Sequence, residues 1–183
     1  RCYKSPISIK FDQITAIVGV NDVGKSTLMD ALSIFFETEK PDRDDLCKAN
    51  ESGKIIITCE FSDVPKSIVI DADFETTLEE EHLLSDRGTL VIQKTYSGAS
   101  MSLSSVCAIS RHPTRSGYED LLSLKRSDLI KRAQEKGVDL TGVDQRKNAP
   151  IRQEIWRSCD DLEFDTVPVP LSAENGKQVW SAL

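Results

Sequence analysis

The feature that most constrains this chain is a glycine-rich turn between a hydrophobic segment and a helix-forming segment. Residues 19–27 read GVNDVGKST, which satisfies the pattern G-x-x-x-x-G-K-[ST] and adds a further threonine. The preceding ITAIVG, residues 14–19, is an almost continuous apolar and β-branched run, as expected of a strand buried on both faces of a sheet. Apolar residues then recur at helical spacing from Leu28 to Phe35 and predict a helix over about residues 25–37.

This order of strand, turn and helix is a setting in which proteins bind phosphate groups. Glycines let the backbone turn tightly, so that several N–H groups point at one anion, and the helix start adds its positive end. In this pattern Lys25 reaches the β- and γ-phosphates, and the Ser26 hydroxyl coordinates Mg²⁺. Lys25 is therefore the candidate catalytic residue and Ser26 the candidate metal ligand. The candidate nucleotide-binding residues are Gly19, Asn21, Asp22, Val23, Gly24, Lys25, Ser26 and Thr27.

Short apolar or alternating runs predict further strands. They cover residues 7–10, 54–61, 67–71 and 89–96. The acidic segment TTLEEEHLLSD is expected to form a helical turn or a loop, and the Ser- and Gly-rich residues 97–117 a turn-rich connection or a weak strand. Because no helix long enough for a crossover separates these strands, an antiparallel or mixed sheet is predicted.

The last third of the chain is predicted to be mostly helical. Residues 118–136 carry apolar side chains at helical spacing among Lys and Arg, and Gly137 is expected to end that helix. A second helix is predicted at 150–159, an extended segment at 167–172, and the start of another helix after it. Because the sequence begins with Arg1 and stops inside a predicted helix, we expect the natural protein to continue.

Composition narrows the class of protein. The chain has 183 residues, 39% hydrophobic and 29% charged, which is ordinary for one globular domain. Its net charge of -7 argues against a general nucleic-acid grip, because such surfaces are normally basic. The five cysteines lack the spacing of a zinc site or a disulfide framework. With no signal peptide and no apolar run of membrane-spanning length, we expect a cytoplasmic protein with reduced thiols and no membrane partner.

The loop resembles the ATPase heads of the RecF/SMC group and, more closely, the overcoming-lysogenisation-defect (OLD) family and related bacterial AAA-type ATPases. Asn21, Lys25, Ser26, Thr27 and the helix LMDAL at 28–32 carry the resemblance. More weakly, the strands at 54–61 and 89–96 look like the antiparallel β-layer of such heads. The segments DLLSLKRSDLIKRAQEKGVDL and NAPIRQEIW look like their helical part.

The resemblance implies an α/β P-loop NTPase fold: the N-terminal lobe of an ABC-type ATPase head, with a mixed or antiparallel sheet and flanking helices. Residues 1–183 would then be the N-terminal portion of one ATPase domain, with the loop's strand and helix at 14–37, a β-layer at about 54–97 and a helical part at about 118–183. It also implies ATP and Mg²⁺ as cofactors and a homodimer or higher oligomer formed around ATP. Through the full-length protein it implies action on DNA, in DNA processing or defence against phage. OLD proteins also carry a metal-dependent Toprim nuclease domain, of which this sequence shows no sign.

Such heads need a Ser-Gly signature and an apolar strand ending in Asp-Glu, and neither is found after residue 120. The run ending in Asp71 resembles the strand, but no Glu follows it, and an ordinary edge strand is favoured. A glutamine that contacts magnesium and water is also characteristic of these heads. The candidates for it are expected to be exposed residues without that role: Gln93, Gln134, Gln145 and Gln153.

Other polar and aromatic residues are given no chemistry. His82 and His112 lack a partner pattern and are expected at the surface. Two basic pairs could contact a phosphate backbone, but a solvated helix face is favoured for them: Lys125-Arg126 and Lys131-Arg132. Trp156 and Trp180 are expected in a core or at a seam with another lobe.

The sequence leaves two alternative functions open and argues against a third. A small GTPase-like switch would need N-K-x-D and D-x-x-G segments, which the sequence lacks. A nucleotide-binding regulatory or structural module without turnover stays open, as does an SMC/RecF-like DNA-repair ATPase without a nuclease domain. We expect ATP hydrolysis in the full-length protein and negligible activity from these residues alone.

Overall fold

The computed structural model describes residue 3 and residues 5–21, 23–49, 51–65, 68–71 and 74–172. The chain divides into two compact units. The first comprises Arg1–Ile57 and Lys94–Ser105, and the second comprises Thr58–Gln93 and Val106–Leu183. The predicted helix after residue 172, and Trp180 within it, lie outside the described residues.

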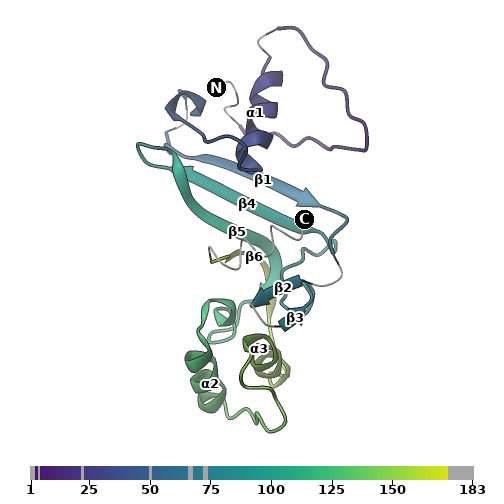
Figure 1. Ribbon diagram of the computed structural model, residues 1–183, viewed down its shortest axis with the longest axis vertical. Coiled ribbons are helices and arrows are strands. Elements are labelled where there is room, and N and C mark those ends of the chain that lie inside the picture. Colours follow the sequence, from purple (N-terminus) through teal and green to yellow (C-terminus); the bar gives the residue numbers. More distant parts are fainter. Residues whose placement is uncertain are drawn as a thin grey trace. The chain divides into compact units, whose positions relative to one another are not determined.

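Four strands form an antiparallel sheet in the order β1-β4-β5-β6 (Figure 1). Its strands are β1 (Ile55–Phe61), β4 (Leu90–Ser97), β5 (Ser102–Pro113) and β6 (Phe164–Pro170). In the antiparallel pairing of β5 with β6, Cys107 lies opposite Pro170 and Pro113 opposite Phe164. The predicted strands at 54–61 and 89–96, the extended segment at 167–172 and the antiparallel arrangement are confirmed.

The segment 97–117 was predicted as a turn-rich connection or a weak strand, and this is wrong for most of its length. It contains the 12-residue strand β5. At the Ser-rich start of β5, the Ser104 hydroxyl donates to the Thr95 carbonyl oxygen at 2.9 Å. Pairing with both neighbouring strands outweighs the low intrinsic strand preference of this segment.

A separate two-stranded sheet pairs β2 (Ile68–Asp71) with β3 (Phe74–Thr76) in antiparallel fashion. The register shifts between Val69 and Asp71, as at a β-bulge. The acidic segment that follows forms turns, as predicted, with the Leu83 N–H donating to the Leu78 carbonyl oxygen at 2.9 Å.

The first unit contains the helix α1 (Lys25–Phe35), which confirms the helix predicted after the glycine-rich turn. Its core joins Ile34, Tyr96 and Met101, and the half-buried Leu46, Ile55 and Ile57 pack against it. A short 3₁₀ turn, η1 (Arg43–Asp45), follows α1. The strands predicted at 7–10 and 14–19 are wrong: neither segment is a strand. A strand buried on both faces needs hydrogen-bonded neighbours, and none of the strands in the described ranges pairs with these residues.

The second unit contains the 3₁₀ turn η2 (Leu121–Ser123) and the helices α2 (Arg126–Glu135) and α3 (Asn148–Arg157). The helix predicted at 150–159 is confirmed. The helix predicted over 118–136 is wrong in its first half, where η2 buries Leu121 and Leu122 before α2 begins. Gly137 ends α2 as predicted, at φ 70°. The Val138 N–H donates to the Ala133 carbonyl oxygen at 2.9 Å, the bond of a glycine-terminated helix.

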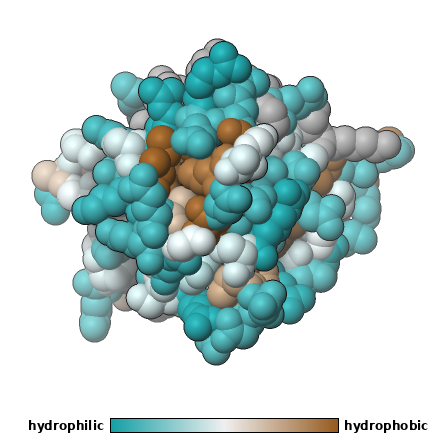
Figure 2. Space-filling view, turned by 90° about the horizontal axis from the view of Figure 1, so that it is seen from below, coloured by the Kyte–Doolittle hydropathy of each residue, from teal (hydrophilic) through white to brown (hydrophobic). Residues whose placement is uncertain are grey.

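The apolar faces of α2 and α3 bury Leu129, Ala133, Ile151 and Ile155. Figure 2 shows the end of the second unit that carries these helices, where hydrophilic residues dominate and hydrophobic residues gather near the centre. No helix in the described ranges combines the length and apolar composition needed to cross a membrane.

Candidate nucleotide site

The glycine-rich turn leads directly into α1. Gly24 is buried and precedes the first helical residue at φ 97° and ψ 15°, a left-handed conformation that glycine adopts without a Cβ clash. No side chain in the described part of the chain caps this helix start. A helix start without a side-chain cap directs its positive end at whatever lies in front of it, and an anion is the natural occupant.

Lys25 folds back over the turn. Its Nζ donates to the carbonyl oxygens of Gly19 at 2.7 Å and of Val20 at 2.6 Å. A Cβ on Gly19 would lie 3.1 Å from Val23 Cγ2, so a side chain at position 19 would crowd the turn. The ammonium group is thus held at the mouth of the turn by weak neutral acceptors that an anion can replace.

The turn is open to solvent. Val18 is 91% exposed, Val20 75% and Val23 49%. Asn21 and Ser26 are exposed, Thr27 is half-buried, and Asp22 lies outside the described residues. The half-buried Tyr3, which sequence reasoning missed, donates its hydroxyl to the Gly24 carbonyl oxygen at 3.1 Å.

These residues fit a phosphate group with Mg²⁺. The ammonium of Lys25 lies on the turn, the uncapped helix start supplies partial positive charge, and the exposed Ser26 hydroxyl sits in the first helical turn. Hydroxyl oxygens are hard ligands of the kind that Mg²⁺ accepts beside phosphate oxygens.

The other end of α1 is held by two residues that the sequence reasoning did not single out. Lys94 Nζ donates to the Phe35 carbonyl oxygen at 2.9 Å, and the Tyr96 hydroxyl donates to the Ile34 carbonyl oxygen at 3.1 Å. A signal was present in the sequence, because Lys94 interrupts the inward-facing apolar positions of the segment at 89–96.

Asp71 ends β2 in the two-stranded antiparallel sheet, which agrees with the ordinary strand that was favoured for it. Gln134 and Gln145 are exposed as expected. Gln93 and Gln153 are not, because both are half-buried: Gln93 Nε2 donates to Thr58 Oγ1 at 3.3 Å and Gln153 Nε2 to Thr76 Oγ1 at 3.4 Å.

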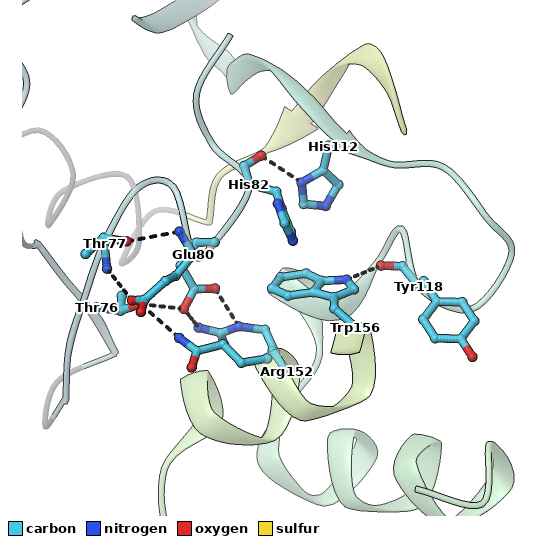
Figure 3. A network of polar contacts seen from close by, with 10 residues as sticks. Thr76, Thr77, Glu80, His82, His112, Tyr118, Arg152 and Trp156 are labelled. Atoms are coloured by element: carbon cyan, nitrogen blue, oxygen red, sulfur yellow. Dashed lines mark hydrogen bonds and ion pairs between the residues drawn. The ribbon is translucent and has the colours of Figure 1, made fainter. Parts of the chain in front are cut away.

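The prediction of surface histidines is wrong. His112 is 1% exposed, and its Nδ1 lies 3.0 Å from the carbonyl oxygen of the half-buried His82. The His82 ring packs edge-to-face on Trp156, with centroids 4.8 Å apart (Figure 3). It also packs edge-to-face on Phe164, with centroids 5.1 Å apart. The fold joins residues that are 30 positions apart, and no local pattern encodes that contact.

The surroundings keep both imidazoles neutral. Burial, assisted by nearby His112, lowers the pKa of His82 to about 4. Burial also lowers the pKa of His112, against the opposing effect of its hydrogen bond to the His82 carbonyl oxygen. Among the described residues no group of three or more His, Cys, Asp or Glu could hold a metal ion. Both imidazole rings pack edge-to-face on Trp156, so the pair is part of this aromatic core.

A buried ion pair lies beside the histidines (Figure 3). Arg152 of α3 is 1% exposed and Glu81 is fully buried. Arg152 Nε and Nη2 donate to the two carboxylate oxygens of Glu81 at 2.9 and 3.0 Å, while Thr76 Oγ1 donates to Glu81 at 3.2 Å. Trp156 is buried in this core as expected, and its Nε1 donates to the Tyr118 carbonyl oxygen at 2.9 Å.

The basic residues of α2 are largely engaged within the second unit. Arg132 Nη1 and Nη2 donate to the Asp120 carboxylate at 2.7 and 3.1 Å, which lowers the pKa of Asp120. Lys131 lies 3.8 Å from Glu135, and Arg126 donates to the Arg146 carbonyl oxygen at 3.0 Å. Lys125, Arg126 and Lys131 are exposed, which fits the solvated face predicted for the two basic pairs, whereas Arg132 is half-buried and does not fit it.

The chain combines a four-stranded antiparallel sheet with α-helices, and its glycine-rich turn leads into a helix start that no side chain in the described residues caps. A family model described as the AAA ATPase domain matches residues 1–183, and the chain belongs to this family. No curated protein and no solved structure matches the chain. Family membership implies ATP binding and hydrolysis, typically with Mg²⁺.

Proposed function

We propose that this chain is the ATP-binding and ATP-hydrolysing head of an OLD-like protein. The observation that carries the proposal is the joining of Gly24, left-handed and buried, to the uncapped start of α1, with Lys25 Nζ held on the turn. Phosphate is the ligand that such an arrangement of backbone N–H groups and one ammonium selects.

The residues divide the work at this site. The backbone from Gly19 to Thr27 cradles the phosphates, Lys25 balances the charge of the β- and γ-phosphates, and Ser26 ligates the metal. Mg²⁺, when bound, neutralises the charge that develops on the phosphate oxygens during transfer. Lys25 exchanges its bonds to the Gly19 and Val20 carbonyl oxygens for charge-assisted bonds to phosphate.

ATP-dependent dimerisation or higher assembly is the second part of the proposal. Nucleotide held between two heads would bring copies together, and hydrolysis would release them, as in other nucleotide-held switches. Action on DNA is proposed through other parts of the full-length protein. The net charge of -7 and the pairing of Arg132 with Asp120 support placing DNA contacts outside the described surface of α2.

A nucleotide-binding regulatory module without turnover is the second candidate. It is favoured by Asp71, which ends a strand of a two-stranded antiparallel sheet and is not followed by the Glu that a hydrolysing head would need. ATP hydrolysis by the full-length protein decides between the two candidates, because a binding module would take up ATP and leave it intact.

The test compares two lysine variants of the first unit, Lys25→Ala and Lys10→Ala. Lys10 has a side chain that is 88% exposed and serves as the matched control. Titration with a fluorescent ATP analogue in the presence of Mg²⁺ is expected to show binding by the wild type and Lys10→Ala, and none by Lys25→Ala. Equal affinity of Lys25→Ala and wild type would overturn the proposed site.

A further inference from the structure

The C-terminal end of α1 is unusually well fixed. The last four carbonyl groups of a helix have no partner within the helix, and water commonly satisfies them. Here the Leu32 and Ser33 carbonyl oxygens accept from the N–H groups of Phe36 and Thr38, at 2.9 and 3.0 Å. The Ile34 carbonyl oxygen accepts from the Glu37 N–H and from the Tyr96 hydroxyl, each at 3.1 Å, and the Phe35 carbonyl oxygen accepts from Lys94 of β4.

Lys94 is a costly residue for this position. Its side chain is 3% exposed, and it also lies 5.2 Å from the centroid of the Phe35 ring. An apolar side chain would fill the same space without the desolvation of an ammonium group. What the ammonium adds is direction, since it bonds one particular carbonyl and places positive charge at the negative end of the helix.

Glu37 adds a second costly feature at the same end. It follows the helix at φ 61°, the left-handed conformation for which glycine is strongly preferred after a helix. The Glu37 carboxylate lies 2.5 Å from Lys94 Nζ and is otherwise largely exposed. A glutamate in this conformation keeps a counter-ion on Lys94 at the cost of backbone strain, and such strain is concentrated at sites with a functional task.

The two ends of α1 are mechanically linked. The helix has 11 residues and spans about 16 Å, and its first residue is Lys25. A hydrogen-bonded helix of this length moves as a rigid rod, so fixing its rotation and axial position at one end fixes them at the other.

We propose that Lys94, with Glu37 and Tyr96, is a positioning residue for the nucleotide loop. By bonding the C-terminal carbonyls of α1 it sets the direction in which the N-terminal N–H groups, Lys25 and Ser26 face the phosphates. This inference rests on the proposed function of the loop. It adds residues of β4, and one residue beyond α1, to the machinery of that site, although none of them touches the nucleotide.

Glu37→Gly separates positioning from simple support. Glycine relieves the left-handed strain at position 37, which offsets part of the cost of removing the counter-ion of Lys94, so the variant should stay within about 1 kcal/mol of the wild type in stability. If Glu37 acts through Lys94 on the loop, affinity for the fluorescent ATP analogue with Mg²⁺ nevertheless falls, by about threefold. A purely structural role predicts stability and affinity that rise or stay level together.

Lys94→Met and Lys94→Arg complete the test. Methionine keeps the length but removes the charge and the donor, and is expected to weaken ATP-analogue binding by about tenfold. Arginine keeps both and should restore most of the affinity. Measurements are made well below the unfolding temperature of each variant, and hydrogen exchange at residues 25–28 should be faster in Lys94→Met than in wild type.

The outcomes separate the two proposals. Loss of binding in Lys25→Ala with unchanged affinity in Glu37→Gly and Lys94→Met would overturn the positioning role and leave the nucleotide site standing. Unchanged binding in Lys25→Ala would overturn the nucleotide site itself. Equal loss of affinity in Lys94→Met and Lys94→Arg would also count against positioning, because the donor and charge would then not matter.

Discussion

The glycine-rich turn of the first unit and the Arg152–Glu81 ion pair of the second unit hold their cations in opposite ways. Lys25 is held by two carbonyl oxygens in an exposed turn. Arg152 is held by both oxygens of a fully buried carboxylate, and the Thr76 hydroxyl adds a further bond to that carboxylate. One cation can change partners and the other cannot.

The two cations differ in whether their hydrogen bonds can be exchanged for bonds to a ligand. Exchanging weak neutral acceptors for a phosphate costs Lys25 little, as a binding loop requires. A buried ion pair repays its desolvation only while every partner is in place, so it stabilises one arrangement and resists change. The glycine-rich turn thus suits the proposed nucleotide, and the Arg152 network suits a fixed core.

The largest expected effect comes from breaking the Arg152–Glu81 ion pair of the second unit. Arg152→Met leaves the Glu81 carboxylate buried without its cation and should lower the free energy of unfolding by about 3 to 5 kcal/mol. Arg157→Met on the same helix is the control, because that side chain is 69% exposed and its loss should cost less than about 0.5 kcal/mol. Urea denaturation measures the free energy of unfolding of both variants. A similarly small effect of the two would contradict the view that the Arg152–Glu81 pair fixes the core of the second unit.

The second prediction concerns the glycine-rich turn of the first unit. Gly24→Ala places a Cβ at φ 97° and should cost about 1 to 2 kcal/mol of stability while weakening ATP binding by tenfold or more. Gly53→Ala is the matched control, since Gly53 lies in the same unit at φ 63° with no atom near the added Cβ. Both should lose similar stability in urea, and only Gly24→Ala should lose nucleotide affinity. Equal affinities in the two variants would mean that the turn geometry does not serve the ligand.

The smallest expected effect is a pH dependence of stability that arises from His82 in the second unit. The folded-state pKa of His82 is about 4, below its ordinary value near 6.5, so the unfolded chain binds the proton more readily. The contribution of His82 is therefore fully present above pH 6.5 and is lost as the pH falls toward 4, and His112 acts in the same direction.

The check is the urea midpoint measured between pH 7 and pH 4 for wild type and His82→Asn. Asparagine tolerates the left-handed backbone at this position, where φ is 52°. The variant should lose the part of the slope that His82 contributes. An unchanged slope would show that His82 is accessible to protons in the folded state.

How far the sequence predicts this molecule depends on how local each feature is. The helix at α1, its start at Lys25 and the antiparallel strands follow from periodicity and from the glycine-rich turn. The left-handed Gly24 fits the glycine requirement of the pattern. These features are encoded within a few residues, so local reasoning reaches them.

The wrong predictions for the histidines and for residues 118–136 depend on contacts between distant residues, and those for strands at 7–10 and 14–19 depend on a pairing partner that the local pattern cannot supply. The sequence predicts surface positions for His82 and His112, because no local pattern around either residue indicates its contact with the other or with Trp156. The helix predicted over 118–136 breaks because the segment before α2 is tied down by long-range bonds, from Trp156 to the Tyr118 carbonyl and from Arg132 to Asp120. Lys94 was overlooked because its acceptor, the Phe35 carbonyl, is 59 residues away.

The most direct test of the central claim is hydrogen exchange with and without Mg²⁺ and ATP, in wild type and Lys25→Ala. We expect ATP to slow exchange over residues 19–28 of the wild type, to leave exchange from Thr76 to Leu84 unchanged, and to slow no exchange in Lys25→Ala. Bound ATP that leaves residues 19–28 unprotected, or equal protection in Lys25→Ala, would contradict it.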